Sequence, residues 1–288
     1  EIIDHFYFLQ FDKKVVFKKN PLQIISGIIK YVIKFILSIY RFIFTRLLIF
    51  SSKKLENNIV LLDVFISPNG NFDKLDTYKD RYYPGIFEHL SAEQKESVYY
   101  NPTFSGGFSG VIKNILSIRR SKNNFLLKER FLKIKDYFFA FFHPFRSLKY
   151  FPKNLFIQGQ DVTFIFKRAF FNGLFNTSSF EALLKYRFSK RLLEKNVKLS
   201  LIIDWFENQI IDRGANIGFK KYYPNIKVIG YQGYVVSEEY LCINPTEVEK
   251  IANTLPDIVC VTGPGLIESR KKYRPSIYFI AIQTFIFS

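Results

Sequence analysis

The clearest pattern of hydrophobic and polar positions lies in residues 198–233. It opens with the apolar run 199–203, which is too short for a helix and rich in β-branched residues, as is typical of a strand buried on both faces. Apolar residues then recur about one helical turn apart, at Ile211, Ala215, Phe219 and Tyr222. Pro224 ends this period, and 227–230 is the next predicted strand. The stretch therefore predicts a β-α-β unit.

Polar residues and glycines follow both strands of this unit, at 205–209 and 231–233. In open α/β sheets, ligands bind beyond the carboxyl ends of the strands, so we expect the functional site there. On the helix between the strands, Gly214 and Gly218 lie on nearly the same face. Their missing side chains predict close packing of this helix on the sheet.

Predicted strands and helices alternate from residue 57 onward. The apolar segment 57–67 predicts a buried strand in which Asp63 is a satisfied structural carboxylate, and 258–261 predicts a further strand. This alternation favours a parallel sheet of the Rossmann-like α/β class. The helix predicted at 180–193 carries a basic cluster that we expect on a solvated face: Lys185, Arg187, Lys190 and Arg191.

A long amphipathic helix is predicted at about 22–50. Its polar residues fall within roughly one third of the helix circumference: Gln23, Ser26, Lys30, Lys34, Ser38, Arg41 and Thr45. A basic stripe beside a broad apolar face is typical of a helix lying in a membrane interface. The alternatives are a core helix or a spanning helix, in which Lys34 and Arg41 would each cost about 2.5–3.5 kcal/mol. A signal peptide is disfavoured, because the basic residues run through the apolar region.

Composition narrows the class of partner. The 288 residues are 48% hydrophobic, which is ample for a core, and carry a net charge of +17, which indicates phosphate, nucleic acid or anionic lipid as a partner. The basic residues are spread along the chain without a nucleic-acid-binding motif, so nucleic acid is not expected. Two isolated cysteines, Cys242 and Cys260, favour a reducing cytoplasm. The lack of Met and the apolar tail 276–288 predict a piece of a longer protein.

A succession of short motifs carries a family resemblance. The motifs are Trp205-Phe206-Glu207-Asn208-Gln209, Asp212-Arg213-Gly214, Gly230-Tyr231-Gln232-Gly233, Pro245-Thr246 with Glu249, and Pro256-Asp257 through Gly263. The chain resembles bacterial surface-carbohydrate biosynthesis proteins and, more broadly, GT-B glycosyltransferases of lipopolysaccharide and capsule assembly. The resemblance is best over 199–270. It implies two Rossmann-like domains facing across a cleft, with a nucleotide-sugar donor bound mainly by the second.

On this basis the chain is expected to hold the N-terminal, acceptor-side half of a GT-B fold, preceded by the amphipathic helix. The predicted division is 1–56 for the membrane-interface region, 57–265 for the Rossmann-like domain, and 266–288 for the start of an interdomain crossing with the apolar tail. The expected partners are a nucleotide-activated sugar, a glycan or lipid-linked acceptor, and the anionic inner face of the cytoplasmic membrane. The alternatives are a polyol-phosphate transferase of the teichoic-acid type, a non-catalytic membrane-associated partner of a glycan-assembly complex, and a basic nucleic-acid-binding protein.

Glu207 is the predicted catalytic residue. Glycosyl transfer needs a base for the acceptor hydroxyl or a carboxylate beside the developing positive charge on the sugar, and a nearby helix N-terminus favours an ionised carboxylate. The alternative is that Glu207 only caps the helix or pairs with Arg213. The predicted substrate-binding residues are Asn208, Gln209, Arg213, Gly230, Gln232, Gly233 and Gly263. No metal or other cofactor is expected, because the histidines lack ligand spacing and no Asp-x-Asp pair occurs.

Overall fold

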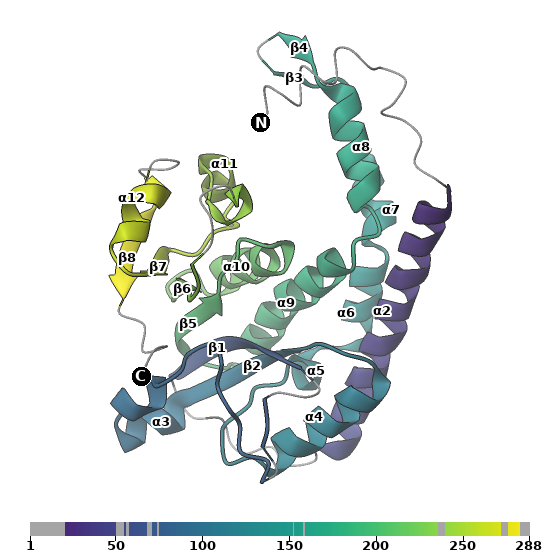
Figure 1. The fold of residues 1–288 in the computed structure, drawn as a ribbon. Helices are drawn as coiled ribbons and strands as arrows, with labels where there is room; N and C mark the ends of the chain where they lie inside the picture. Colours follow the sequence, from purple (N-terminus) through teal and green to yellow (C-terminus); the bar gives the residue numbers. More distant parts are fainter. Residues whose placement is uncertain are drawn as a thin grey trace. The chain divides into compact units, whose positions relative to one another are not determined.

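The computed structural model describes residues 21–49, 55, 58–67, 71–73, 75–151, 153–157, 159–235, 240–271 and 276–282 (Figure 1). The chain divides into two compact units. Unit 1 is Glu1–Lys34 with Pro144–Thr177, and unit 2 is Phe35–His143 with Ser178–Ser288. The predicted membrane-interface region and apolar tail lie partly outside the described residues, at 1–20 and 283–288.

Unit 2 is built on a six-stranded sheet in the order β2-β1-β5-β6-β7-β8, in which every neighbouring pair is parallel. The strands are β1 (Ile59–Ile66), β2 (Val98–Phe104), β5 (Leu199–Trp205), β6 (Lys227–Gln232), β7 (Ile258–Thr262) and β8 (Tyr278–Ile282). The predicted α/β class with a Rossmann-like parallel sheet is therefore confirmed.

Besides the second half of α2 (Pro21–Leu48), the remaining elements of unit 2 are mostly short helices. They are η2 (Ile86–His89), α3 (Ala92–Ser97), α4 (Phe108–Arg120), α5 (Lys128–Phe131), α6 (Ile134–Phe141), α9 (Thr177–Glu194), α10 (Ile210–Tyr222), η4 (Leu241–Ile243), α11 (Glu247–Ile251) and α12 (Gly265–Lys271). Unit 1 holds the first half of α2 (Pro21–Leu48), then α7 (His143–Ser147), η3 (Leu148–Tyr150), β3 (Phe156–Ile157), β4 (Gln160–Asp161) and α8 (Thr163–Gly173).

Successive side chains along the central strands point to opposite faces of the sheet. Leu62, Val64 and Ile66 of β1 belong to one core, which also contains the buried side chains of α4. Leu61 and Asp63 point to the opposite face, where α9 and α10 lie side by side (Figure 1). The sheet is thus covered on both faces, which is why its central strands are nearly continuous apolar runs.

The two helix glycines pack differently from the prediction. A Cβ on Gly214 would lie 2.7 Å from Cα of Ala182, and one on Gly218 would lie 2.9 Å from Cα of Tyr186. Both neighbours belong to α9, so the glycines allow close contact between two helices rather than between a helix and the sheet. The sequence therefore predicted correctly which face of α10 makes close contacts, but it did not predict that this face meets α9.

The interpretation of residues 276–288 as an apolar tail is wrong for residues 278–282. Residues 278–282 form β8, which pairs in parallel with β7 from Ile258↔Tyr278 to Thr262↔Ile282. Phe279 is buried in a core cluster with Val259 and Val261 of β7. The sheet therefore extends beyond the predicted boundary at 265, because this short apolar run forms its edge strand.

Helix α2 forms as predicted, but its polar stripe does not face solvent throughout. Ser38, Arg41 and Thr45 are buried, whereas Ile36 and Ile43 of the opposite face are 51% and 45% exposed. The Arg41 guanidinium donates to the carbonyl of Phe104 (3.3 Å) and to Ser38 Oγ (3.0 Å). It also pairs with Glu181 Oε2 at 3.4 Å.

The C-terminal half of the polar stripe is therefore an internal contact. A buried Arg is tolerated where carboxylate and carbonyl oxygens satisfy its donors. Among the helices in the described part of the chain, none is both long enough and apolar enough to cross a membrane.

Candidate functional site

The chain reverses its direction of winding between β1 and β5. From β1 it moves to β2 on one side, and from β5 it moves to β6 on the other, although β1 and β5 are neighbours. Such a switch point opens a crevice beyond the carboxyl ends of the two strands, where ligands of open α/β sheets bind. The site predicted at 205–209 lies at the end of β5 and therefore at this switch point.

A loop before η2 fixes two tyrosines at the seam between these strands. The pairing of β1 with β5 ends at Leu62↔Ile203, and beyond it the Tyr83 hydroxyl donates to the carbonyl of Asp63 (2.9 Å). Asp80 holds the loop, because its Oδ1 accepts the backbone N–H groups of Tyr82 (2.8 Å) and Tyr83 (2.9 Å). The loop thereby delivers Tyr82 to the end of β5.

Three aromatic side chains, which we call the aromatic frame, surround the end of β5: Tyr82, Trp205 and Tyr234. The Tyr82 ring stands edge-on to Trp205 at 4.7 Å between centroids, and Tyr234 lies at 5.8 Å and 32° to the indole. Gly233 makes room for the indole, since a Cβ there would lie 2.6 Å from Trp205 Cζ3. Gly233 therefore shapes the frame.

The Glu207 carboxylate lies at this frame. Its Oε1 accepts the indole N–H of Trp205 at 2.8 Å, and its Oε2 accepts the side-chain amide of Gln209. Burial raises the pKa of Tyr82, and the charge of Glu207 raises it further. The same two causes, in the same order, raise the pKa of Tyr234. The predicted catalytic carboxylate and one predicted binding residue, Gln209, are thus brought together among aromatic rings.

The structure contradicts both structural alternatives for Glu207. Asp212, not Glu207, caps α10: its Oδ2 accepts the backbone N–H groups of Glu207 and Gln209, each at 2.9 Å. Arg213 pairs with Glu249 at 2.5 Å and donates to the carbonyl of Asn208. Helix α10 is therefore capped without using the Glu207 side chain.

Asn208 and Arg213 have internal roles. Asn208 has a left-handed backbone (φ 54°) and is buried. Its amide donates to the carbonyl of Cys242 at 3.0 Å and to Glu249 at 3.3 Å. These bonds, with the Arg213–Glu249 pair, tie the end of β5 to the 242–249 segment. Both residues therefore position the site.

Three further predicted binding residues lie elsewhere. Gln232 is buried, donates to the carbonyl of Ile243 (3.1 Å) and accepts from Arg270 (3.3 Å). Gly230 packs in β6 against Phe206, whose Cγ a Cβ would approach to 2.9 Å. Gly263 has φ +101° with open space around it, at the carboxyl end of β7. Gln232 and Gly230 thus make internal contacts, and Gly263 lies at the end of a different strand.

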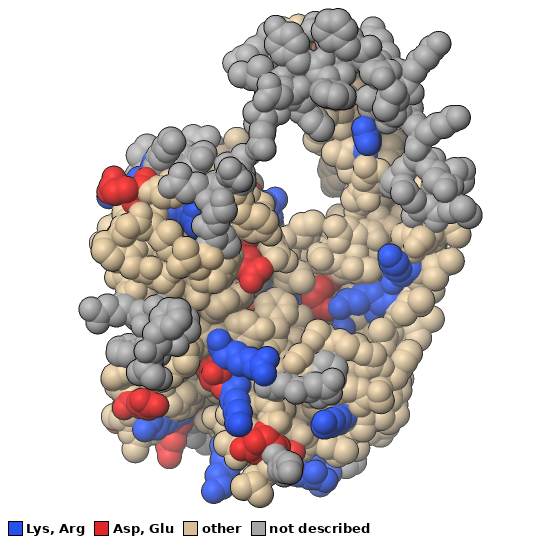
Figure 2. Space-filling model, in the orientation of Figure 1, with Lys and Arg blue, Asp and Glu red and all other residues tan. Residues whose placement is uncertain are grey.

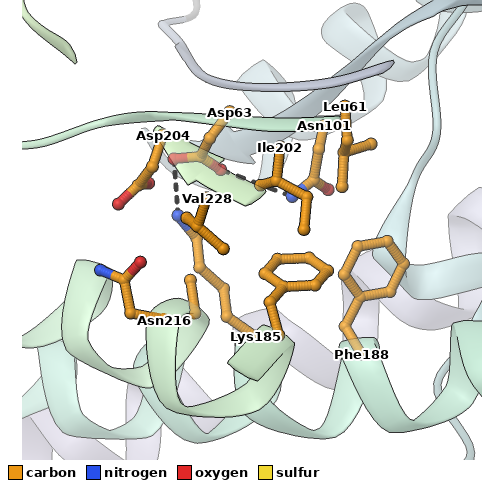
Figure 3. Close-up of a pocket in the computed structure, with 11 residues that line it drawn as sticks. Leu61, Asp63, Asn101, Lys185, Phe188, Ile202, Asp204, Asn216 and Val228 are labelled. Carbon is orange, nitrogen blue, oxygen red and sulfur yellow. Dashed lines mark hydrogen bonds and ion pairs between the residues drawn. The ribbon is translucent and has the colours of Figure 1, made fainter. Parts of the chain in front are cut away.

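Beneath the switch point, on the α9–α10 face, lies a buried polar cluster (Figure 3). Lys185 Nζ of α9 pairs with Asp63 Oδ2 of β1 at 2.7 Å, and Asn101 Nδ2 donates to Asp63 Oδ1 at 3.4 Å. Asp204 of β5 lines the same small cavity, of about 10 Å³. Asp63 is a satisfied structural carboxylate, as predicted, but the expectation that Lys185 is solvated is wrong.

The charge balance of this cluster shifts its pKa values. Burial raises the pKa of Asp204 well above its ordinary value, and the charges of Asp212 and Asp63 add to this effect. Burial also raises the pKa of Asp212, to about 6. Burial alone would lower the pKa of Lys185, but the nearby carboxylates, Asp63 foremost, raise it overall.

The rest of the predicted basic cluster on α9 is also largely internal. Arg191 is buried and pairs with Asp136 of α6 at 2.6 Å, and Arg187 pairs with the same carboxylate at 2.7 Å. Lys190, the fourth residue of this cluster, is half-buried. A buried carboxylate such as that of Asp136 needs more than one donor. Because both donors lie on α9, these pairs join α9 to α6.

Surface charge gives no sign of a continuous basic band on the face drawn in Figure 2. Lys and Arg side chains there stand singly or in small groups, with Asp and Glu among them and uncharged surface between. Among the described residues, no group of three or more His, Cys, Asp or Glu side chains is placed to hold a metal ion.

Sequence reasoning located Glu207 and Gln209 but not the aromatic frame. Trp205 is the only tryptophan of the chain, and its place two residues before Glu207 was an available signal. Tyr82 and Tyr234 come from loops whose positions depend on tertiary contacts.

Comparisons of the chain with protein-family models, with curated proteins and with solved structures found no match.

Proposed function

We propose that this chain is the acceptor-side part of a GT-B-like glycosyltransferase of bacterial surface-polysaccharide assembly. It transfers a sugar from a nucleotide-activated donor to a glycan or lipid-linked acceptor at the cytoplasmic membrane face. The observation that carries the proposal is the Glu207 carboxylate, held at the β1–β5 switch point inside the aromatic frame of Tyr82, Trp205 and Tyr234.

The chemistry of a sugar fits this arrangement. A binding site for such a ligand combines apolar aromatic walls with a few oriented polar groups. A carboxylate has about four lone-pair positions, and Trp205 and Gln209 occupy two of those on Glu207. The remaining positions can accept a sugar hydroxyl and its proton, which is the role of a general base.

The donor would be bound mainly by a second domain, as the family resemblance implies. This donor is a substrate, and the proposal includes no bound metal or cofactor. Peripheral attachment by α2 is part of the proposal, but the exposed apolar face of this helix, including Ile36 and Ile43, replaces the basic stripe as the contact.

A direct test uses the only tryptophan. Because the Trp205 indole contacts Glu207, a ligand at the site should change its fluorescence. A panel of nucleotide sugars and bacterial glycans would be titrated against the protein that contains this chain. Transfer by Glu207→Gln would then be compared with that of Glu268→Gln, which changes an exposed glutamate of α12. We expect a loss of about 10²–10⁴-fold for the first variant, with an unchanged thermal midpoint.

Two results would overturn the proposal. One is near-normal transfer by Glu207→Gln, which would remove the carboxylate from the reaction. The other is the absence of any fluorescence change and of any transfer with the whole panel, which would remove sugar chemistry from the site.

A further inference from the structure

The segment 144–177 of unit 1 leaves most of its aromatic surface uncovered. In α8 only Thr163 is buried, although the eleven residues include four phenylalanines. Phe166 and Phe171 are exposed, the latter by 53%, and Phe145 of α7 is 61% exposed. An isolated helix of this length is marginal in water, so its stability depends on a surface that covers it.

The first half of α2, which belongs to the same unit, shows the same property. Its large exposed apolar residues are Ile24, Ile25, Ile28, Ile29, Val32 and Ile33. Among the apolar residues of 24–34, whose side chains the structure describes, Tyr31 alone is buried, with its ring 5.8 Å from that of Phe175. Two separate stretches of sequence therefore contribute apolar surface to one unit. Many exposed large apolar side chains in one unit are unusual for a surface that meets only water.

The charge of this unit indicates what covers the surface. Residues 21–34 and 144–177 contain Lys30, Lys34, Arg146, Lys149, Lys153, Lys167 and Arg168 but only one acidic residue, Asp161. Basic side chains lie against aromatic rings, as where Lys149 Nζ is 4.8 Å from the Tyr150 ring centre and Lys167 Nζ is 5.6 Å from that of Phe151. Aromatic and aliphatic groups alternating with lysine and arginine are the composition of an element that lies in an anionic membrane interface.

We propose that unit 1 is a membrane-docking module whose second contact element is α8, with the occupant of its apolar surface being an anionic lipid bilayer. Phe166 and Phe171 enter the headgroup–acyl boundary, and Lys167 and Arg168 remain at the phosphate level. This extends the proposed peripheral attachment from α2 to a segment more than a hundred residues later in the chain. It does not depend on the transferase reaction, because lipid binding requires neither donor nor acceptor.

The experiment is sedimentation of the purified protein with vesicles. One set is pure phosphatidylcholine, and the other contains about one third phosphatidylglycerol. The apolar variant is Phe166→Ser with Phe171→Ser, matched by Val248→Ser with Ile251→Ser on the exposed side of α11 in unit 2. The charge variant is Lys167→Glu with Arg168→Glu, matched by Lys95→Glu with Lys113→Glu, which are also exposed.

We expect the wild-type protein to prefer anionic vesicles. Each Phe→Ser change should weaken partition about tenfold, and each unit of charge removed should weaken it about fivefold on anionic vesicles only. Both matched controls should bind like the wild type. Phe166→Leu with Phe171→Leu should keep most of the binding, which excludes loss of folding as the cause.

Three results would overturn the inference. The first is equal binding by the Ser variant and the wild type, which would exclude α8 from the contact. The second is equal binding to both vesicle types, which would remove the electrostatic contribution. The third is no vesicle binding together with a dimer in ultracentrifugation that the Ser variant abolishes, which would make a second copy of the chain the occupant. None of these results bears on sugar transfer.

Discussion

Replacing Lys185 by Met should be one of the most damaging single changes in the sheet domain. The substitution keeps a long, flexible apolar chain and removes only the ammonium group. Lys185 is 1% exposed and its Nζ lies 2.7 Å from Asp63 Oδ2. The change therefore leaves the Asp63 carboxylate buried without its cation, close to Asp204 and Asp212.

The expected loss of stability follows from the burial of this ion pair. Removing one partner of a buried ion pair typically costs about 3–5 kcal/mol, since the remaining charge loses both water and its counter-ion. A domain has about 5–15 kcal/mol of stability in total, so this loss is a large part of it. Adding Asp63→Asn removes the orphaned charge and leaves the amide of Asn101 a neutral acceptor. The double variant should recover most of the loss.

The assay is urea unfolding at pH 7.5, with the free energy of unfolding extrapolated to water. Lys190→Met is the matched control, because Lys190 lies on the same helix but is only half-buried. It should change the free energy by less than about 0.5 kcal/mol. A loss below about 1 kcal/mol for Lys185→Met, or a double variant no better than the single one, would refute this account of the cluster.

Three other predictions concern α10 and the turn after β7. Gly214→Ala should lower the free energy of unfolding by about 2–3 kcal/mol, because its Cβ would meet the Ala182 backbone, whereas Gly107→Ala, with open space, should cost far less. The pKa of Asp212 rises from 3.8 to about 6 on folding, so this group stabilises the fold at low pH and loses about 3 kcal/mol as the pH rises through 6. Asp212→Asn should flatten the pH dependence of urea-unfolding stability between about pH 4 and 6.5, and an unchanged slope would exclude this group. Gly263→Ala, at φ +101°, should lower the thermal midpoint at a cost of about 1 kcal/mol or more, and an unchanged midpoint would contradict the strain.

The elements that the sequence predicted best are those encoded by consecutive residues. The run 199–203 became β5, and the helical period after it became α10, because a doubly buried strand and an amphipathic helix each have a local pattern. Glu207 was predicted for the same reason, since the end of a buried strand can be located without knowing its neighbours.

Partners distant in sequence explain the errors. The period of α2 showed which residues share a face but not which face meets protein, and Glu181, the partner of Arg41, is 140 positions away. Lys185 was taken as solvated because Asp63 is 122 positions away. The aromatic frame needed Tyr82 and Tyr234, which loops bring to Trp205 from opposite directions along the chain.

The pairing of β1 with β5 has a consequence for biosynthesis. Ile59 lies opposite Leu199, so the central seam of the sheet closes a loop of about 140 residues. A ribosome that adds about 5–20 residues per second needs roughly 7 to 28 seconds to make that length. During this interval the β1–β2 pair has an uncovered edge and an uncovered apolar face, a situation that favours aggregation. We therefore expect folding of the nascent chain to depend on chaperones until α9 and β5 have left the ribosome.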